Sequence, residues 1–216
     1  MTSLSFPQNL KYRFTQPLPG ESAQFKMAPQ RRLTMQEYYE LGNKNPRKSA
    51  VLICLYPYQE SLYTLLMLRP HEQGAHSGQV SFPGGRFETE DGDLKTTALR
   101  EAEEEIGIDR SAVEIIGALS GLYIPVSNSF VQPYAGYLSV KPVLKKNDRE
   151  VKEIIETDTR ILFDPALKGM GLFEGLKNIA IEAPYYNILS HKVWGATAMM
   201  LSELESILKE LDAIPG

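Results

Sequence analysis

The chain has 216 residues, of which 43% are hydrophobic and 23% are charged, and its formal net charge is -4. This length allows one domain of about 150 residues with extensions. The acidic balance gives no reason to expect nucleic acid as a main partner. The one cysteine, Cys54, excludes an intrachain disulfide and fits a reducing cytoplasm.

The N-terminus lacks a basic segment followed by an apolar core, and no run approaches the roughly 18 apolar residues of a membrane span. We therefore expect a cytoplasmic protein with no signal peptide and no membrane partner. Residues 1–47 carry five prolines and no recognisable chemistry. They are predicted to form an N-terminal extension that packs on the domain or helps form a dimer, with the domain itself spanning residues 48–216.

Two apolar segments follow the extension. Residues 49–58 and 62–69 are expected to be strands, joined by a hairpin turn over residues 57–61. Cys54 lies in the first apolar run and is expected to be a buried small hydrophobe, not a nucleophile. Arg69 closes the second strand. It is either an exposed strand-end residue or a phosphate contact, since arginine binds phosphate oxygens bidentately.

A polar segment over residues 70–77 leads to a short expected strand over residues 79–82. His71 and His76 have no Cys or His cluster nearby, so no zinc site is predicted. The sequence Pro83-Gly84-Gly85 then turns the chain sharply. Two glycines allow a close approach of the backbone to a phosphate, so the predicted substrate contacts are Arg69, Gly84, Gly85 and Arg86.

The next segment is predicted to be a helix, and the rest of the chain is organised around it. One apolar stripe at helical spacing is made by Leu94, Ala98, Ala102 and Ile106. The residue before the helix, Asp93, is a suitable N-cap. The residue after it, Gly107, is placed for a left-handed C-cap.

Three glutamates on this helix point the same way, because Glu101, Glu104 and Glu105 stand at positions i, i+3 and i+4. Like charges at i,i+4 cost about 0.2–0.5 kcal/mol per pair, and Arg100 is expected to neutralise only one of them. A solvated acidic face is the simpler interpretation. The alternative is a cation site, because Mg²⁺ is usually held by one or two carboxylates plus substrate phosphates.

The segment over residues 85–108 closely resembles the Nudix box, G-x5-E-x7-R-E-U-x-E-E-x-G-U with U apolar. The loop is one residue longer than the common box, which puts Gly85 and Asp91 in the roles of the opening glycine and the upstream acid. The other matches are Arg100, Glu101, Ala102, Glu104, Glu105, Gly107 and Ile108.

The segment LLMLRPHEQGAHSGQVSFPGG, residues 65–85, resembles the signature of the coenzyme A pyrophosphatase branch of Nudix hydrolases. That branch also tends to have the longer loop with an Asp. The matching residues are Leu65, Leu66, Arg69, His76, Gly78, Val80, Phe82, Pro83, Gly84 and Gly85.

The resemblance implies an α/β fold, the Nudix α/β/α sandwich with a mixed β-sheet between helices. It implies metal-dependent hydrolysis of a nucleoside diphosphate linked to another moiety, most specifically coenzyme A or acyl-coenzyme A to 3′,5′-ADP and 4′-phosphopantetheine or its acyl form. Mg²⁺ or Mn²⁺ would bind Glu101 and Glu105, with Glu104 assisting. Arg100 would orient these carboxylates, and the general base would be Glu104 or a later acid, Glu150 or Glu153.

After the helix, strands are expected over residues 113–119 and within 130–140, the latter broken by Pro133, with a loop over 122–127 between them. Residues 169–175 are expected to be a glycine-rich loop, and residues 178–182 and 185–189 closing strands. A C-terminal helix is expected to open near residue 191 and to end near Leu211, with Trp194 in the core. No repeat or clean linker divides the chain, so one domain is predicted.

Two other functions remain open from the sequence. A Nudix hydrolase could act on ADP-ribose, NADH or a nucleoside triphosphate. A nucleotide-sensing Nudix module without catalysis is the second alternative, although such modules would be expected to lose box glutamates that this chain keeps. The expected partner is a small-molecule diphosphate, with no nucleic acid and no membrane. A homodimer is common in the family, but no interface can be read from the sequence.

Overall fold

The computed structural model describes residues 6–29, 34–40, 45–70, 78–174 and 180–211. The helices are α1 (Phe6–Phe14), α2 (Glu21–Gln24), α3 (Met35–Glu40), α4 (Leu94–Ile106) and α5 (Gly195–Glu210). Short 3-10 turns occupy Phe25–Met27, Thr89–Asp91, Arg110–Ala112, Pro125–Ser127, Thr159–Phe163 and Pro165–Leu167. None of the helices in these ranges is long and apolar enough to span a membrane.

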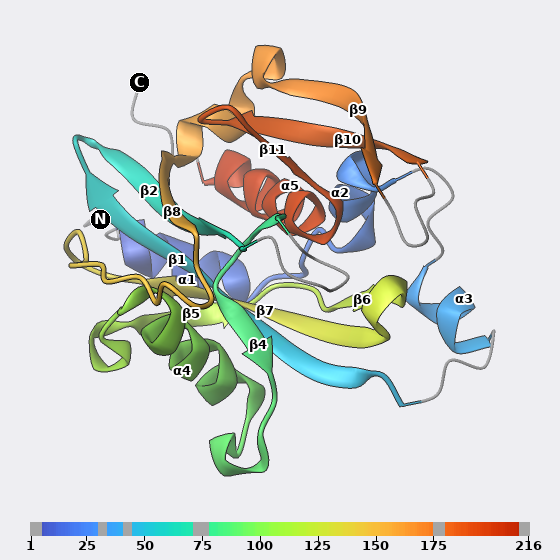
Figure 1. Cartoon of the computed structure of the whole chain (residues 1–216). Helices are drawn as coiled ribbons and strands as arrows, with labels where there is room; N and C mark the ends of the chain where they lie inside the picture. The colour runs from blue at the N-terminus through green and yellow to red at the C-terminus, as the bar shows by residue number, and fades with distance from the viewer. Residues whose placement is uncertain (1–5, 30–33, 41–44, 71–77, 175–179, 212–216) are drawn as a thin grey trace.

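Within the described ranges, eight strands form the main sheet (Figure 1). Its path is β3-β2-β1-β7-β5, with β4 paired to β1, β6 to β7 and β8 to β2. The sheet is mixed, because β1 and β7 are parallel whereas β1 and β2 are antiparallel. The strands are β1 (Arg47–Tyr58), β2 (Ser61–Leu68), β3 (Val80–Ser81), β4 (Gly84–Arg86), β5 (Glu114–Ala118), β6 (Leu122–Ile124), β7 (Ser129–Tyr137) and β8 (Glu153–Asp158).

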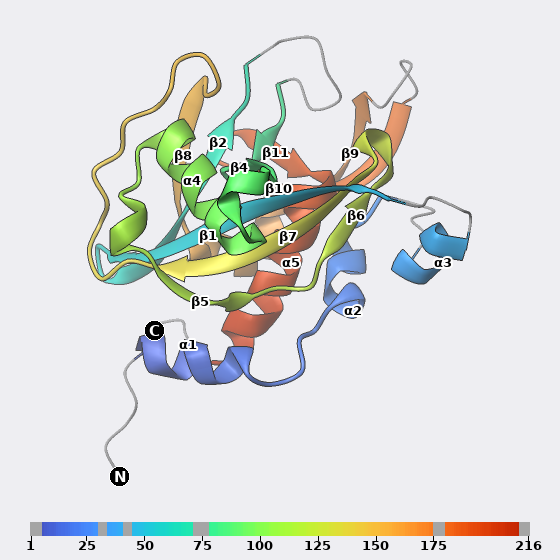
Figure 2. The ribbon, with the colours of Figure 1, turned by 90° about the horizontal axis from the view of Figure 1, so that it is seen from below.

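The two faces of the main sheet are covered by different helices. Helix α4 places Ala98, Ala102 and Ile106 against one face of β1, where Cys54 is also fully buried as predicted. Helix α5 covers the other face and forms the larger core with β1 and β2. Figure 2 shows α4 and α5 on opposite sides of β1 and β7. The predicted α/β/α sandwich is therefore confirmed.

A second, three-stranded sheet covers the far side of α5. It has the order β11-β10-β9, with β9 (Lys168–Glu174), β10 (Ala180–Ile188) and β11 (His191–Trp194) all antiparallel. The prediction of a glycine-rich loop over residues 169–175 is wrong. The glycines of this strand make room for aromatic rings. A Cβ at Gly169 would lie 2.8 Å from Tyr185 Oη, and one at Gly171 would lie 3.1 Å from Phe173 Cζ.

Further sequence predictions also need correction. The two closing strands are one strand, β10, and a strand, β11, precedes the C-terminal helix. Residues 122–124 of the expected loop form β6. Pro133 does not break β7, because it lies where the neighbouring strand changes from β5 to β6 and a missing N–H costs little there. Trp194 is only half-buried and stacks on Phe173 with ring centroids 4.5 Å apart.

The N-terminal segment is tied into the fold by α5. Leu10, at 0% exposure, belongs to the core cluster that contains α5. The fully buried Glu203 accepts hydrogen bonds from Gly20 N (3.1 Å), Gln24 Nε2 (2.9 Å) and Ser120 N (3.2 Å). A buried carboxylate needs such donors, since burial without them is costly. Residues 6–29 therefore pack closely on the domain, while the boundary at residue 47 stays a prediction.

Candidate active site

Helix α4 begins and ends as its sequence predicts. The Asp93 carboxylate accepts a hydrogen bond from Thr96 N at 2.7 Å, which caps the first turn. Gly107 has φ 73° and ψ 20°, the left-handed conformation expected of a C-cap residue. These caps fix where the helix starts and stops, so the position of each glutamate along it is determined locally.

The loop before α4 is clamped to the helix by Asp91. Its buried carboxylate accepts hydrogen bonds from Glu88 N (3.0 Å), Thr97 Oγ1 (2.7 Å) and Arg100 Nε (2.7 Å). The hydrogen bond from the Arg100 guanidinium holds the pKa of Asp91 well below its usual range. Thr97 matches no position of the motif, so its contact with Asp91 was not predicted from the sequence. Its place one turn before Arg100 is the only clue that the sequence gives.

Arg100 pairs with two of the three helix glutamates and with Asp91, so the prediction that it neutralises only one of the glutamates is wrong. Besides Asp91, its Nη1 lies 3.1 Å from Glu101 Oε1 and 3.1 Å from Glu104 Oε2. Its Nη2 donates to the Arg86 carbonyl at 3.1 Å. A guanidinium can make all these contacts because it has five N–H groups. The loop brings Asp91 and the Arg86 carbonyl to it by folding back over the helix. Arg100 thus links the loop to the acidic helix face.

Glu105 is the most buried of the three glutamates. Its side chain is 2% exposed, and it accepts a hydrogen bond from Gly84 N at 2.7 Å. Arg69 Nη2 lies 3.5 Å from the other carboxylate oxygen. Burial raises the pKa of Glu105 to about 8, and the charges of Glu101 and Glu150 act in the same direction. A nearby cation would favour the ionised form of this carboxylate.

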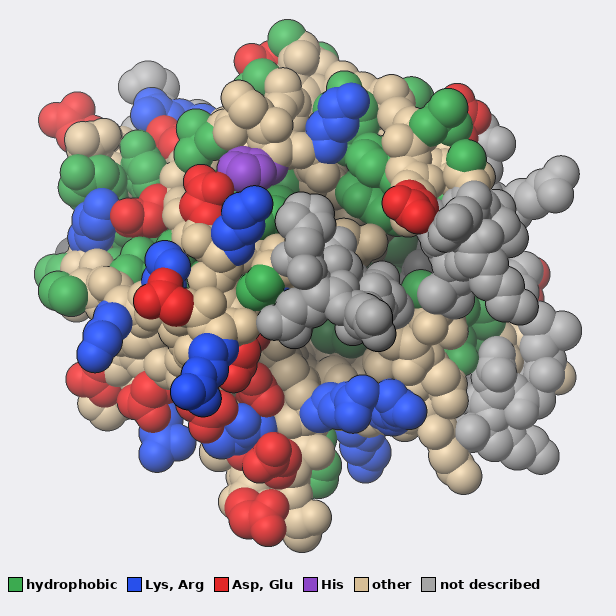
Figure 3. All heavy atoms as spheres, in the orientation of Figure 1, with side chains coloured by type: hydrophobic (Ala, Val, Ile, Leu, Met, Phe, Trp, Pro, Cys, Tyr) green, Lys and Arg blue, Asp and Glu red, His purple; other side chains and the backbone are tan. Residues whose placement is uncertain are grey.

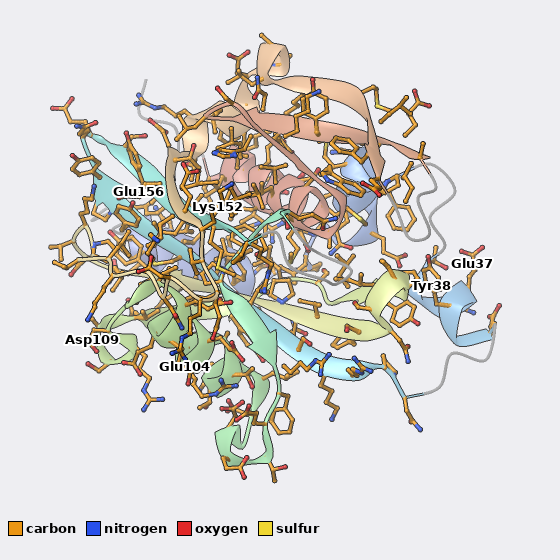
Figure 4. The ribbon with its side chains drawn as sticks, viewed as in Figure 1. Glu37, Tyr38, Glu104, Asp109, Lys152 and Glu156 are labelled. Atoms are coloured by element: carbon orange, nitrogen blue, oxygen red, sulfur yellow. The ribbon has the colours of Figure 1, made fainter. Side chains whose placement is uncertain are left out.

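Glu101 and Glu104 differ in depth. The Glu101 side chain is 15% exposed and is packed against Gly85, where a Cβ would lie 2.3 Å from the Glu101 carboxyl carbon. Burial also raises the pKa of Glu101. The Glu104 side chain is 53% exposed and lies on the outer surface of α4 (Figure 4). One buried, one packed and one exposed carboxylate therefore share this end of the helix.

The structure separates the two later acids that the sequence left open. The chain after β7 returns to the end of α4, where Asn147 N donates to the Glu105 carbonyl at 2.8 Å. Glu150, three residues further on, lies near enough for its charge to raise the pKa of Glu101 and Glu105. Glu153 begins β8 and lies 3.5 Å from His191 Nε2. Glu150 is therefore brought to the site, and Glu153 faces another partner.

Two of the four predicted substrate contacts, Arg69 and Gly84, bind Glu105. Besides Glu105, the Arg69 guanidinium donates to Ser81 Oγ (3.3 Å) and the Gly84 carbonyl (3.2 Å), so it braces the glycine turn. Gly84 has φ 154°, and a Cβ there would lie 2.3 Å from the Ala50 carbonyl oxygen. The glycines are thus required by close packing in the protein itself. Contacts of these residues and of the exposed Arg86 with substrate remain predictions, and His71 and His76 lie outside the described residues.

The donor chemistry fits a hard divalent cation. Among the described residues, no three His, Cys, Asp or Glu side chains form a group that could hold a metal ion alone. Mg²⁺ does not need such a cage, because one or two carboxylates and substrate phosphate oxygens suffice. The closely packed carboxylates Glu101 and Glu105 provide that number.

Comparison with known proteins places the chain in a family. A model of the NUDIX domain matches residues 46–159, more than half of the chain. The chain is 38% identical over 186 residues to the uncharacterized Nudix hydrolase NudL of Yersinia pestis, covering 82% of this chain and 85% of that protein. The chain belongs to the Nudix hydrolase family. The helix α4 is accordingly its Nudix helix.

Other relatives are more distant in length or in sequence. Mitochondrial Nudix hydrolase 15 of Arabidopsis thaliana is 47% identical over 75 residues, which span 34% of this chain but only 26% of that protein. The NUDIX domain of Shewanella oneidensis NrtR, solved with ADP ribose, matches with a TM-score of 0.51 at 13% identity, over 82% of this chain and 99% of that one. This second likeness shows that the Nudix fold is shared.

The raised pKa of Glu105 predicts how the stability of the metal-free protein depends on pH. The folded state holds a proton up to about pH 8, whereas the unfolded state loses it near the ordinary value of 4.5. Because the folded state binds more protons in this window, the free energy of unfolding should fall as pH rises from 4.5 to 8.

Urea unfolding with a chelator present, across that pH range, measures this dependence. Glu105→Gln should flatten it, since the neutral amide cannot titrate. Glu103→Gln, an exposed residue on the same helix, is the control and should leave it unchanged. An equally steep dependence in Glu105→Gln would contradict the assignment.

Proposed function

We propose that the protein hydrolyses the diphosphate of a nucleoside diphosphate linked to another moiety, with Mg²⁺ or Mn²⁺ as cofactor. The observation that carries the proposal is the buried Glu105 carboxylate, held by Gly84 N at 2.7 Å beside the packed Glu101. Two desolvated carboxylates with raised pKa values lower the stability of the fold unless a bound cation compensates their charges. The cation, when bound, neutralises the diphosphate and activates water.

The residues around these carboxylates have separate roles in the proposed reaction. Arg100 holds Glu101 and Glu104 while Asp91 fixes Arg100, so the carboxylates are positioned before substrate arrives. Arg69 and Gly84 N do the same for Glu105. Water attacks one phosphorus of the diphosphate in line, the bond to the bridging oxygen breaks, and a phosphate monoester leaves.

A general base must accept a proton from the attacking water. Glu104 is the most exposed of the three box glutamates, and Glu150 is the later acid whose charge acts on Glu105. A base must be near the nucleophile and able to hold a proton at the working pH. We favour Glu104 or Glu150 for this role, because both lie close to groups that hold or feel the helix carboxylates, whereas Glu153 pairs with His191.

Coenzyme A or acyl-coenzyme A is the substrate we favour, with 3′,5′-ADP and 4′-phosphopantetheine or its acyl form as products. Its support is the segment over residues 65–85, which resembles the coenzyme A pyrophosphatase branch. Within this segment, Arg69, Ser81 and Gly84 are joined by the Arg69 hydrogen bonds, so part of the signature shapes the site. The choice of substrate depends on loops as well as on the shared helix.

Product analysis tests this proposal. The purified protein with Mg²⁺ or Mn²⁺ is expected to convert coenzyme A to 3′,5′-ADP, with no conversion when the metal is chelated. Parallel reactions contain 3′-dephospho-coenzyme A, NADH and ADP-ribose. Faster cleavage of one of these would keep the chemistry and overturn the substrate. Tight nucleotide binding without turnover at any metal concentration would instead indicate a sensing module.

A further inference from the structure

The small sheet ends at a strand whose outer edge pairs with no other strand of the described residues. This strand is β9, which pairs on its inner side with β10 (Figure 1). An exposed edge offers unpaired N–H and C=O groups to another strand, and proteins usually protect such edges with charges, prolines or bulges. The sequence of β9, KGMGLFE, has charge only at its two ends and no proline.

The side chains of β9 are unusually apolar for an edge. On one face Met170 is 54% exposed and Leu172 is 75% exposed. On the other face Phe173 stacks on Trp194 and meets the Tyr185 ring edge-on, at 6.0 Å between centroids. Figure 3 shows hydrophobic side chains at the surface over this sheet. Large apolar side chains gathered at one exposed edge are typical of an interaction site.

The geometry points to a second copy of this chain as the partner, with β9 of each copy paired antiparallel about a two-fold axis at Gly171. In this register the residues equally far from Gly171 face each other. Met170 of one copy lies opposite Leu172 of the other, and Lys168 lies opposite Glu174. Apolar side chains therefore meet in the middle and opposite charges meet at both ends.

The backbone supports this choice of centre. Pro184 of β10 stands opposite Met170 and has no N–H to donate. On its other side Pro184 has no strand partner in the described part of the chain, because the β10–β11 register begins at the pair of Tyr185 and Trp194. Proline is tolerated where its missing N–H faces an unpaired side. Met170 and Leu172 then direct their backbone groups outward, which the proposed pairing requires.

The pairing is closed and does not involve the catalytic residues. The same edge is used by both copies, so a two-fold dimer leaves no further β9 edge exposed and does not extend into a fibre. Lys168 keeps its contacts with Glu205 at 2.8 Å and remains 28% exposed at its side chain. Helix α4 lies on the opposite side of the main sheet from the small sheet (Figure 1). The interface is thus independent of the proposed reaction.

Light scattering over a series of protein concentrations tests the interface. The full chain is expected to have the mass of a dimer, and Leu172→Lys should have the mass of a monomer, because a lysine on the edge opposes pairing. Val143→Lys, at a residue that is 91% exposed, is the matched control and should remain a dimer. Circular dichroism and hydrolysis of coenzyme A check that Leu172→Lys stays folded and keeps its activity.

Disulfide trapping tests the register. Met170→Cys is mixed with Leu172→Cys that carries an extra tag, and the mixture is oxidised. Residues directly opposite are about 5.5 Å apart at Cα, within reach of a disulfide, whereas diagonal ones are about 7–8 Å apart. Mixed disulfide dimers should therefore exceed those of either variant alone, and the buried Cys54 should not contribute.

Three results would overturn the proposal. The first is a monomer for the unaltered chain at every concentration. The second is a dimer that Leu172→Lys leaves intact, which would place the contact on another surface. The third is equal trapping of mixed and like pairs, which would reject the register centred on Gly171.

Discussion

Glu105→Gln is expected to lower kcat by about 10³-fold, equivalent to about 4 kcal/mol of transition-state stabilisation. Glu105 is the buried carboxylate of the Nudix helix, fixed by Gly84 N at 2.7 Å. The amide keeps the size of the side chain and an oxygen that can accept from Gly84 N. It removes the negative charge that would hold Mg²⁺ or Mn²⁺, so catalysis should fail while the fold persists.

Steady-state kinetics at saturating coenzyme A, over a range of Mg²⁺ concentrations, measure this loss. Glu103→Gln is the matched control, because Glu103 is on the same helix but is 42% exposed and pairs with Arg110 at 3.3 Å. Its activity should stay within about twofold, as expected for an exposed ion pair. Activity of Glu105→Gln near that of the unaltered chain would remove Glu105 from the proposed metal site.

The same substitution separates stability from function. An ionised carboxylate buried at 2% exposure costs folding free energy that a neutral amide does not. The metal-free Glu105→Gln protein at pH 8 should thus be at least as stable as the unaltered chain. Such a trade-off is common at active sites, where a residue needed for activity lowers the stability of the protein.

The helix at the centre of the site could be predicted because its signals are local. The two caps, Asp93 and Gly107, lie directly next to the helix ends that they specify. The apolar stripe from Leu94 to Ile106 lies within the helix itself. The chain needs no distant contact to place the three glutamates on one face. The box resemblance adds chemistry to a helix that the local pattern already defines.

The remaining parts of the site depend on residues far apart in sequence. Arg100 gains Asp91 as a partner only after the loop folds back, and Glu150 reaches the site because Asn147 N binds the last turn of α4. Such closures leave no periodic pattern in the sequence. For this reason the sequence could not distinguish Glu150 from Glu153.

Two of the errors in the fold also share a physical origin. Gly171 and Pro133 are poor strand residues by propensity, yet both lie within strands. Gly171 leaves room for the rings of Phe173 and Tyr185, and Pro133 lies where the partner of β7 changes. Tertiary packing decides these positions, and a single sequence does not show which ring or strand will be the neighbour.

Gly85→Ala is expected to lower kcat/KM by about 10²-fold while leaving the protein folded. The added Cβ would lie 2.3 Å from the carboxyl carbon of Glu101 and 2.3 Å from its Oε1. Those atoms are the end of a flexible side chain, so Glu101 can move aside. A shift of about 1 Å in a group that positions the reaction can cost about 10²-fold, and the Mg²⁺ concentration for half-maximal activity should rise.

Two other glycines show whether this loss is specific. At Gly84 the added Cβ would meet backbone, 2.3 Å from the Ala50 carbonyl oxygen and 2.6 Å from Val51 Cα, so Gly84→Ala should disturb the fold as well. At Gly195, with φ 65° and open space around it, alanine adds only about 1–2 kcal/mol of backbone strain. Thermal unfolding together with kinetics should therefore give three different outcomes. Full activity in Gly85→Ala would show that the reaction does not depend on where Glu101 is held.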